Sequence, residues 1–221
     1  MIKLEFTVTP SNDQWKAAIR GMRNAMNSWS ASDSYSTRIE NPETLNTAEF
    51  QFFLGEADMK LMQKLIAAGA DHAKFLRMLP VMVDIVAPLY WWAEYDTYKV
   101  GTVANSCSKM HKIHEKEFTL DDFSYEHLTA VCVSLLEKTI VCLNAKRDLY
   151  NLGKGKNDWW QMIQLLPSSY NQRRTVSLNY AVLRNMYHAR KDHKLDEWRD
   201  FCKWIETLPY ARELICSSTM P

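Results

Sequence analysis

The fold is decided by residues 79–95, LPVMVDIVAPLYWWAEY. In the first half of this stretch, Val81, Val83 and Ile85 recur at every second position, which is the period of a β-strand with one buried face. Pro88 follows, and its fixed φ angle suits the first turn of a helix through the aromatic residues after it. The stretch therefore predicts a strand that ends just before the proline and a helix that begins there.

Apolar residues recur at helical spacing over much of the rest of the chain. Ser11 is suited to cap a helix whose apolar stripe includes Trp15 and Met22. The longest helix is expected from Ser124 to about Tyr150. Further helices are expected over 57–68, 159–166, 179–191 and 195–208. A strand with one buried face is expected over 2–9, and another strand over 174–178. A polar loop is expected over 28–47, and an exposed polar loop over 98–112. The predicted fold class is α+β: one mainly helical domain spanning residues 1–221, with a small mixed or antiparallel sheet.

Composition limits the kinds of site to consider. The chain has 221 residues, and 47% of them are hydrophobic, which is enough for a sizeable core. Its 27 basic and 26 acidic residues give a net charge of +1. This balance argues against a general nucleic-acid binder, because such proteins usually carry a basic excess. A small anionic ligand needs only a few local cations, and the 6 glycines leave little material for a Gly-rich phosphate loop.

Cysteine usage and hydropathy predict a cytoplasmic protein. The cysteines number 5 and contain no CxxC pair, so a disulfide scaffold is not expected. The N-terminus lacks the apolar region of a signal peptide. The longest apolar stretch, 79–92, is interrupted by Asp84 and two prolines and is too short to span a bilayer. We therefore expect no membrane partner.

Two sets of side chains have metal-binding or nucleophilic chemistry, and each has a structural interpretation beside it. His111 and His114, and also His188 and Asp192, have spacings that can hold a metal ion, but solvated polar faces explain them better. No metal site is therefore expected. Cys107 lies in a polar loop near a lysine, which would favour a nucleophilic thiolate. The alternative is a small side chain that lines a pocket.

Cations and aromatic residues are the other candidates. The cations that folding could gather around a phosphate are Lys99, Lys109, Arg173, Arg174, Arg184 and Arg190. Arginine would bind a phosphate bidentately and lysine as a point charge, while scattered solvated cations are the alternative. The aromatic residues Tyr90, Trp91, Trp92, Tyr95 and Tyr98 fit a core, although some of them could present a face to a ring-bearing cofactor.

Residues 97–110, TYKVGTVANSCSKM, resemble the signature R-H-R-x-x-S-x-N-E-x-S-x-R-Y of the flavin-dependent thymidylate synthases, the thymidylate synthase complementing family. The match is one of residue type. Lys99 and Lys109 keep cations where the family has arginines, and Thr102 keeps a hydroxyl. Cys107 replaces a serine and Asn105 a glutamate. Thr97 and Tyr98 stand where the family has arginine and histidine.

The rest of the chain extends this resemblance over most of residues 1–205. The C-terminal half matches the family's order of a Leu-Pro pair, an arginine, an asparagine that opens a helix and an arginine that ends it. These positions are Leu166, Pro167, Arg173, Asn179, Asn185 and Arg190, with His193 near the family's histidine. Upstream, Glu94 stands where the family has a glutamine, and residues 18–23, AIRGMR, resemble the arginine segment of its first helix.

The resemblance implies an α+β subunit of a homotetramer whose active sites are shared between subunits. It implies FAD as cofactor, NADPH and methylenetetrahydrofolate as co-substrates, and dUMP as the substrate that receives a one-carbon unit at uracil C5. By the same resemblance, the residues that would bind dUMP are Glu94, Asn105, Ser106, Cys107, Ser108, Lys109, Arg173 and Arg190. Those that would border the flavin are Tyr98, Lys99, Thr102, Asn179, Asn185 and His193. Arg190 would polarise the uracil, which makes it the main catalytic candidate.

The departures from the signature leave several hypotheses open. The product is dTMP or a related C5-modified nucleotide. Cys107 adds a second catalytic hypothesis, in which its thiolate attacks uracil C6 as in the unrelated classical-type thymidylate synthases. A diverged homologue that binds nucleotide but has lost the redox step is the alternative to an enzyme, and a purely structural oligomer is the third. All of the enzymatic hypotheses require Lys109, Arg173 and Arg190 to meet in one cleft, built across neighbouring chains.

Overall fold

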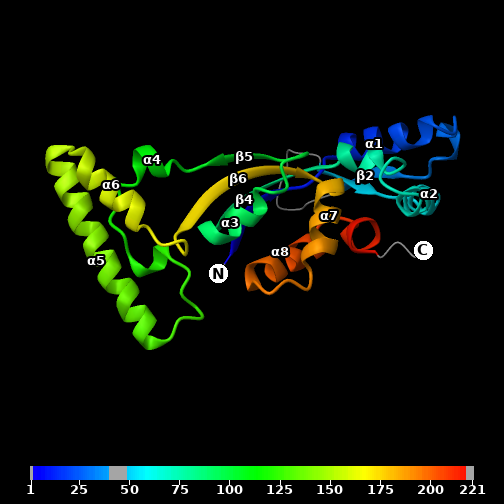
Figure 1. The fold of residues 1–221 in the computed structure, drawn as a ribbon. Helices are drawn as coiled ribbons and strands as arrows, with labels where there is room; N and C mark the ends of the chain where they lie inside the picture. Colours follow the sequence, from blue (N-terminus) through cyan, green and yellow to red (C-terminus); the bar gives the residue numbers. More distant parts are fainter. Residues whose placement is uncertain (1, 40–48, 218–221) are drawn as a thin grey trace. The chain divides into compact units, whose positions relative to one another are not determined.

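The computed structural model describes residues 2–39 and 49–217. Helices and strands are interspersed along the chain, and the α+β, mainly helical fold class is confirmed (Figure 1). In chain order the elements are β1 (Lys3–Val8), α1 (Asn12–Asn24), β2 (Tyr35–Ile39), β3 (Glu49–Phe53), α2 (Glu56–Ala67), β4 (Pro80–Pro88), α3 (Leu89–Tyr95), β5 (Val103–Ser106), α4 (Lys109–Lys112), α5 (Ala130–Gly153), α6 (Lys156–Leu165), β6 (Asn171–Asn179), α7 (Tyr180–Arg190) and α8 (Asp196–Glu206). Among the described residues, no helix has both the length and the apolar character that crossing a bilayer requires.

Contacts between Cα atoms divide the chain into two compact units. Unit 1 comprises Met1–Glu5, Asp84–Thr97 and Ala104–Val176, and unit 2 comprises Phe6–Val83, Tyr98–Val103 and Ser177–Pro221. The chain passes from one unit to the other within β1, β4, β5 and β6, and also between Thr97 and Tyr98. A single domain over residues 1–221 therefore stays a prediction.

The two sheets have four strands, in the order β1-β4-β6-β5, and two strands, β2 and β3. The strand predicted before Pro88 is confirmed as β4, where Val83 and Ile85 are buried and Met82 is 48% exposed. In β1 the predicted one-sided burial is wrong, because Phe6 is 77% exposed. Phe6 has a φ of 52°, and this left-handed backbone interrupts the regular pleat that would place alternate side chains on one face.

Both predicted loops contain regular structure. In the first loop, β2 pairs antiparallel with β3, with Tyr35 opposite Phe53, while residues 40–47 of that loop lie outside the described residues. In the second loop, the structure places β5 and the short helix α4. The prediction that the second loop is exposed is confirmed for β5, all of whose residues are exposed. In β2 and β5, apolar residues do not recur at every second position. These two strands therefore depend on pairing with a neighbouring strand rather than on burial of one face.

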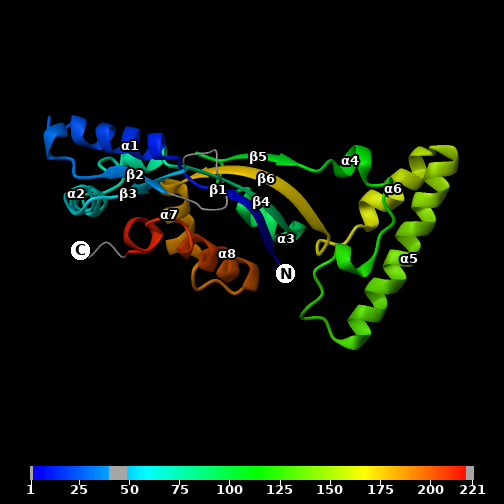
Figure 2. The same ribbon diagram turned by 180° about the vertical axis from the view of Figure 1, so that it is seen from behind.

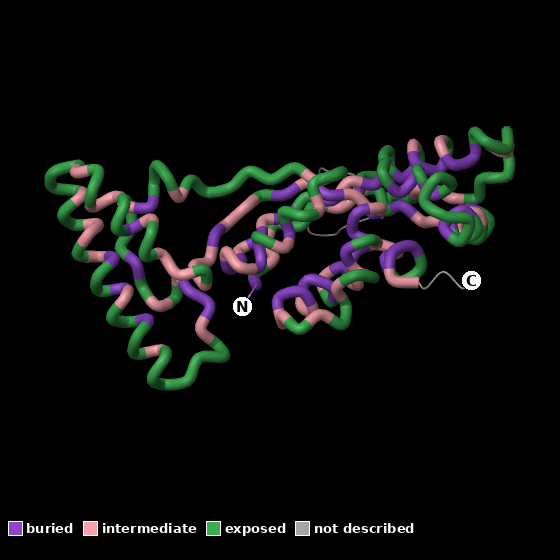
Figure 3. Tube along the Cα trace, viewed as in Figure 1, coloured by how far each residue is buried: buried purple, intermediate pink, exposed green. Residues whose placement is uncertain are grey.

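The predicted helices are confirmed, with shifted boundaries. Ser11 caps α1 in a capping box with Gln14, and the apolar stripe of this helix is buried, with Trp15 stacked on Phe52 at 5.5 Å between ring centroids. Helix α5 begins at Ala130 rather than near Ser124 and packs against α6, as the views in Figures 1 and 2 agree. Most of its residues are exposed, and they are coloured green in Figure 3. Its buried residues are Leu136, Ile140 and Leu143.

Candidate functional site

A cavity of about 500 Å³ in unit 1 brings together the residues expected to cradle a phosphate and a sugar. Cys107, Ser108, Lys109 and Arg173 all line it. The sequence did not single out the other cations of its wall, which are Lys3, Lys112 and Lys116. Its acidic residues are Glu5, Glu117 and Asp122. We call it the basic pocket, and its lining suits an anionic ligand.

Backbone pairing holds the 107–109 segment beside β6. The backbone N–H of Cys107 donates to the carbonyl oxygen of Arg173 at 3.0 Å, and the Gln172 side-chain amide donates to the Cys107 carbonyl at 2.8 Å. Ser108 then caps α4, since its hydroxyl accepts from the backbone N–H of His111 at 3.1 Å. These contacts explain why residues far apart in the sequence line the same pocket.

Arg173 of β6 is held by two carboxylates, Asp84 from the neighbouring strand β4 and Glu5 from β1, which lies beyond β4 in the sheet. Its guanidinium lies 2.5 Å from Glu5 and 3.0 Å from Asp84, and Thr175 donates to Asp84 at 2.6 Å. The Thr175 hydrogen bond and the Arg173 charge lower the pKa of Asp84, and the two carboxylates raise the pKa of Arg173. An incoming phosphate therefore has to compete with Glu5 and Asp84 for this cation.

Lys109 has no such carboxylate. Among the residues that the structure describes, no carboxylate oxygen lies within ion-pair distance of its ammonium group. Burial, followed by the charge of Arg174, lowers the pKa of Lys109, while Asp96 acts in the opposite direction. Arg174 itself pairs with Asp96 at 2.7 Å and lies 4.1 Å above the ring of Trp92. Lys109 is therefore the partly buried cation of the basic pocket whose charge a ligand can use directly.

In unit 2, an aromatic cluster surrounds Arg190. Its Nε donates to the Tyr98 hydroxyl at 2.8 Å, and its guanidinium carbon lies 4.9 Å from the ring centroid of Trp198. His193 lies against the same indole, at 6.4 Å between ring centroids. Tyr98, Arg190 and His193 were expected to act at the uracil and the flavin, and the structure brings these three together. Trp198 was missed, because an apolar position in an amphipathic helix gives no sign that its ring borders a site.

A second cavity of unit 2, about 670 Å³ in volume, is lined by both asparagines expected at the flavin, Asn179 and Asn185. We call it the amide pocket. The Asn179 side chain accepts from the Val182 backbone N–H at 3.0 Å, which caps α7. Gly101 has a φ of +81°, and a Cβ there would lie 3.1 Å from the Asn179 amide nitrogen. A glycine therefore suits position 101, both because of the positive φ and because of the space that Asn179 occupies.

The remaining predicted residues do not line either cavity; they are Glu94, Lys99, Thr102, Asn105 and Ser106. The Thr102 hydroxyl donates to the Tyr98 carbonyl at 2.6 Å, and Asn105 and Ser106 are exposed on β5. Their roles stay predictions. So does the cleft shared by Lys109, Arg173 and Arg190, since the first two line the basic pocket and Arg190 belongs to unit 2.

The side chains that could ligate a metal are not clustered in the part of the chain that the structure describes. Over residues 2–39 and 49–217, no group of three or more His, Cys, Asp or Glu side chains is placed to hold a metal ion. Of the histidines singled out by their spacing, His188 contacts a backbone carbonyl, the oxygen of Ile215, at 3.0 Å. Burial, followed by the charge of Arg184, lowers the pKa of His188.

Comparisons with known proteins place the fold. No protein-family model matches the chain, and no curated protein matches it in sequence. A crystal structure of the flavin-dependent thymidylate synthase ThyX from Helicobacter pylori, complexed with FAD and dUMP, superimposes with a TM-score of 0.63 at 17% identity over 97% of each chain. Another structure of Helicobacter pylori ThyX with FAD and dUMP gives 0.62 at 16% identity, over 97% of this chain and 96% of the other. The resemblance in the sequence is thus confirmed at the level of the fold: the chain has the fold of the flavin-dependent thymidylate synthases.

Proposed function

We propose that the protein transfers a one-carbon unit from methylenetetrahydrofolate to C5 of dUMP in a flavin-dependent reaction, giving dTMP or a related C5-modified nucleotide. One observation carries the proposal. The residues assigned to the dUMP phosphate and sugar from the resemblance, Cys107, Ser108, Lys109 and Arg173, line one basic pocket. The ThyX structures with the same fold contain dUMP and FAD, which fits this assignment.

In this proposal the basic pocket binds the 5′-phosphate. Lys109 contributes a point charge, and Arg173 contributes the only guanidinium among the residues that line this pocket. Because Glu5 and Asp84 already accept from Arg173, the phosphate takes the place of at least one carboxylate. Lys109 then supplies the larger share of the initial attraction.

Arg190 is proposed to polarise the uracil. A cation lowers the barrier only if it already points at the atom where negative charge develops. The Tyr98 hydroxyl and the Trp198 ring hold the Arg190 guanidinium in one place, which provides such preorganisation. This role needs no nucleophile from the protein.

The residues of the amide pocket fit a flavin. Its volume lies within the range of about 300–1,000 Å³ that is usual for cofactor sites. Its wall is largely apolar, with Leu76 and Val182 among its residues, and Asn185 and Arg77 add polar groups for ring atoms or phosphates. When bound, reduced FAD would supply the hydride of the reaction. NADPH and methylenetetrahydrofolate are proposed as co-substrates.

We also propose a cytoplasmic homotetramer whose subunit forms one domain. The support for assembly is a row of exposed residues along α5 at the spacing of a coiled-coil seam, apolar toward both ends and interrupted by Lys138. Its members include Val131 (81% exposed), Leu135 (65%), Leu149 (49%) and Leu152 (87%). A second chain would remove these side chains from water, and sedimentation analysis would measure the resulting mass.

The decisive test is the product. Purified protein is incubated with dUMP, methylenetetrahydrofolate, FAD and NADPH, and the nucleotides are analysed by mass spectrometry. We expect a product that carries one added carbon, and yellow protein with flavin absorbance. A Lys109→Gln variant should lose product formation, whereas Lys203→Gln, on an exposed face of α8, should not. Colourless wild-type protein that forms no product would overturn the proposal.

One observation favours a second candidate, a homologue that binds nucleotide without catalysis. Thr97 and Tyr98 replace an Arg-His pair of the signature, and the Tyr98 hydroxyl is instead bonded to Arg190. In that case dUMP would raise the melting temperature while no flavin copurifies and no product forms.

A further inference from the structure

A third cavity, in unit 2, gathers cations that the proposed function does not use. Lys16, Arg20 and Arg23 follow helical spacing and lie on one face of α1. All three line a cavity of about 200 Å³, together with Ile19, Trp29, Ser32 and Ser34. We call it the α1 pocket. Arg20 and Arg23 come from the AIRGMR segment, to which neither the basic pocket nor the amide pocket gives a role.

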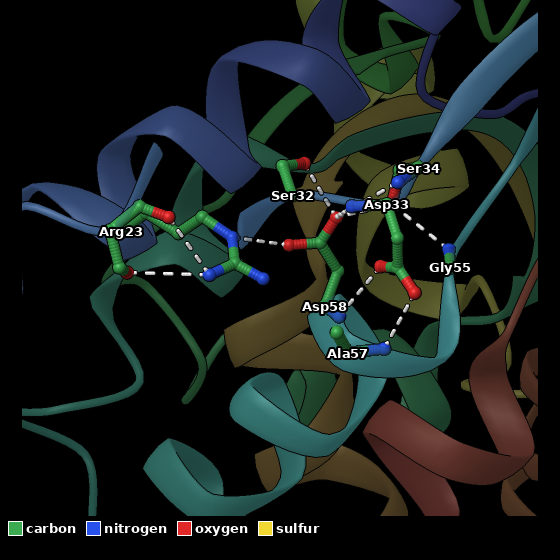
Figure 4. A network of polar contacts seen from close by, with 8 residues as sticks. Arg23, Ser32, Asp33, Ser34, Gly55, Ala57 and Asp58 are labelled. Atoms are coloured by element: carbon green, nitrogen blue, oxygen red, sulfur yellow. Dashed lines mark hydrogen bonds and ion pairs between the residues drawn. The ribbon is translucent and has the colours of Figure 1, made fainter. Parts of the chain in front are cut away.

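Arg23 is the buried member of this set. Its side chain is only 4% exposed, and its Nε donates to Asp58, which is fully buried, at 2.6 Å. Its Nη1 donates to the carbonyl and the hydroxyl of Ser28, at 3.1 and 3.3 Å. Asp58 also accepts from the hydroxyls of Ser32 and Ser34 (Figure 4). The ion pair is therefore fixed from both sides.

The remaining terminal nitrogen of Arg23, Nη2, is available to a ligand. Among the described residues it has no hydrogen-bond partner, and no dashed line reaches it in Figure 4. Nη2 is not one of the fully buried side-chain atoms that lack a partner, so this donor keeps contact with the surface of the pocket. Because Arg23 lines the α1 pocket, a ligand oxygen there could satisfy this donor.

The rim of the pocket supplies the net positive charge. The carboxylate of Asp58 neutralises the charge of Arg23. The net positive charge of the pocket therefore comes from Lys16 and Arg20, which are both exposed. Lys16 is 3.9 Å from Asp13, whose side chain is 93% exposed, so this contact is weak. Trp29 forms part of the wall, and its indole N–H donates to the Asn24 side chain at 2.8 Å, which fixes the ring.

We propose that the α1 pocket binds one phosphate group, either as inorganic phosphate or as the end of a phosphate ester. The Arg23 Nη2 donates from within, and Lys16 and Arg20 contribute charge at the rim. The volume is below the range of whole small-molecule sites, so a single oxyanion group is the appropriate size. Any remainder of an ester lies outside, beside the half-exposed Trp29 ring.

The test uses the full chain with inorganic phosphate as the probe. Binding is followed through the indole ¹H–¹⁵N signal of Trp29, which is assigned with Trp29→Phe. We expect a saturable shift in the wild type and a loss of affinity of at least about tenfold in Lys16→Gln/Arg20→Gln, the equivalent of about 1.4 kcal/mol. Lys64→Gln, an exposed cation of α2 outside the pocket, is the matched control and should bind like the wild type.

Three further measurements test whether the loss of phosphate binding is specific to the α1 pocket. Both rim side chains are exposed, so the double variant should keep the wild-type melting temperature, and Arg23 stays in place. Lys109→Gln should weaken dUMP binding without changing the Trp29 response, which separates this site from the proposed function. Phenyl phosphate that binds more tightly than phosphate identifies an ester as the ligand, and equal affinity identifies the free ion. A Trp29 signal that does not move, or an equal loss in Lys64→Gln, overturns the proposal.

Discussion

Arg23 and Arg173 form ion pairs of the same chemical type in very different surroundings. In unit 2, Arg23 and Asp58 are 4% and 0% exposed. In unit 1, Arg173 is 41% exposed, and its partners Glu5 and Asp84 are 39% and 21% exposed. Water can replace a lost partner in the second case but not in the first. The comparison teaches that Arg23 maintains the fold, while Arg173 can exchange its carboxylates for a ligand.

The largest effect is expected when the buried pair is broken. Asp58→Asn removes the charge that compensates Arg23, and the loss of a partner from a buried pair typically costs about 3–5 kcal/mol. Urea denaturation would measure this as a decrease in the free energy of unfolding. Glu56→Gln is the control, because it breaks the exposed Glu56–Lys60 pair on the same helix and should change stability little. Equal effects of the two substitutions would contradict the contrast drawn between buried and exposed pairs.

Arg173→Ala should act mainly on the ligand. If Arg173 binds the dUMP phosphate, its loss should cost about 1.5–3 kcal/mol of binding free energy, the range for hydrogen bonds to charged groups. Isothermal titration with dUMP would show this as a weakening of roughly ten- to a hundredfold, with little change in the free energy of unfolding. Lys203→Gln provides the control for removal of a distant positive charge. Strong destabilisation with unchanged dUMP affinity would instead make Arg173 structural, like Arg23.

The buried pair should also respond to pH. Burial alone would raise the pKa of Asp58, but hydrogen bonds from Ser34 and Ser32 and the charge of Arg23 outweigh it, so the pKa is lowered. A carboxyl group whose folded-state pKa is depressed stabilises the fold above its unfolded pKa, about 3.9, and loses this contribution as the pH falls further. The difference in unfolding free energy between the wild type and Asp58→Asn should therefore shrink below about pH 4. A difference that stays constant in acid would show that Asp58 protonation does not contribute.

Local signals in the sequence explain which parts of the fold were predictable. Ser11 and Pro88 mark helix starts through their own backbone chemistry, and the period of Val81, Val83 and Ile85 marks a buried face. β2 has no such signal. Its central residues, Ser36, Thr37 and Arg38, are polar, and the strand exists because it pairs with β3, which a local pattern does not encode.

The candidate site likewise contains some residues that the sequence identified and others that it could not. Residues 107–109 and Arg173 were found by residue type within a motif, and the pairing of β5 with β6 brings them together. Lys112 and Lys116 were missed because their positions depend on the turn that Ser108 starts. The carboxylate partners of Arg173 were missed as well, since strand order places Glu5 and Asp84 beside it.

The smallest effect is expected at Cys107, and it bears on the chemistry of the basic pocket. Electrostatic activation by Arg190 needs no thiolate, so Cys107→Ser should leave turnover of dUMP unchanged, as measured by product formation at saturating substrate. Cys132→Ser, at an exposed position of α5, controls for loss of a thiol elsewhere. The pairing with β6 uses only the backbone of Cys107, so a serine keeps the segment in place. An inactive but nucleotide-binding Cys107→Ser would therefore point to attack by the thiolate on uracil C6, and Arg190 would then act by stabilising a covalent intermediate rather than by polarising the ring alone.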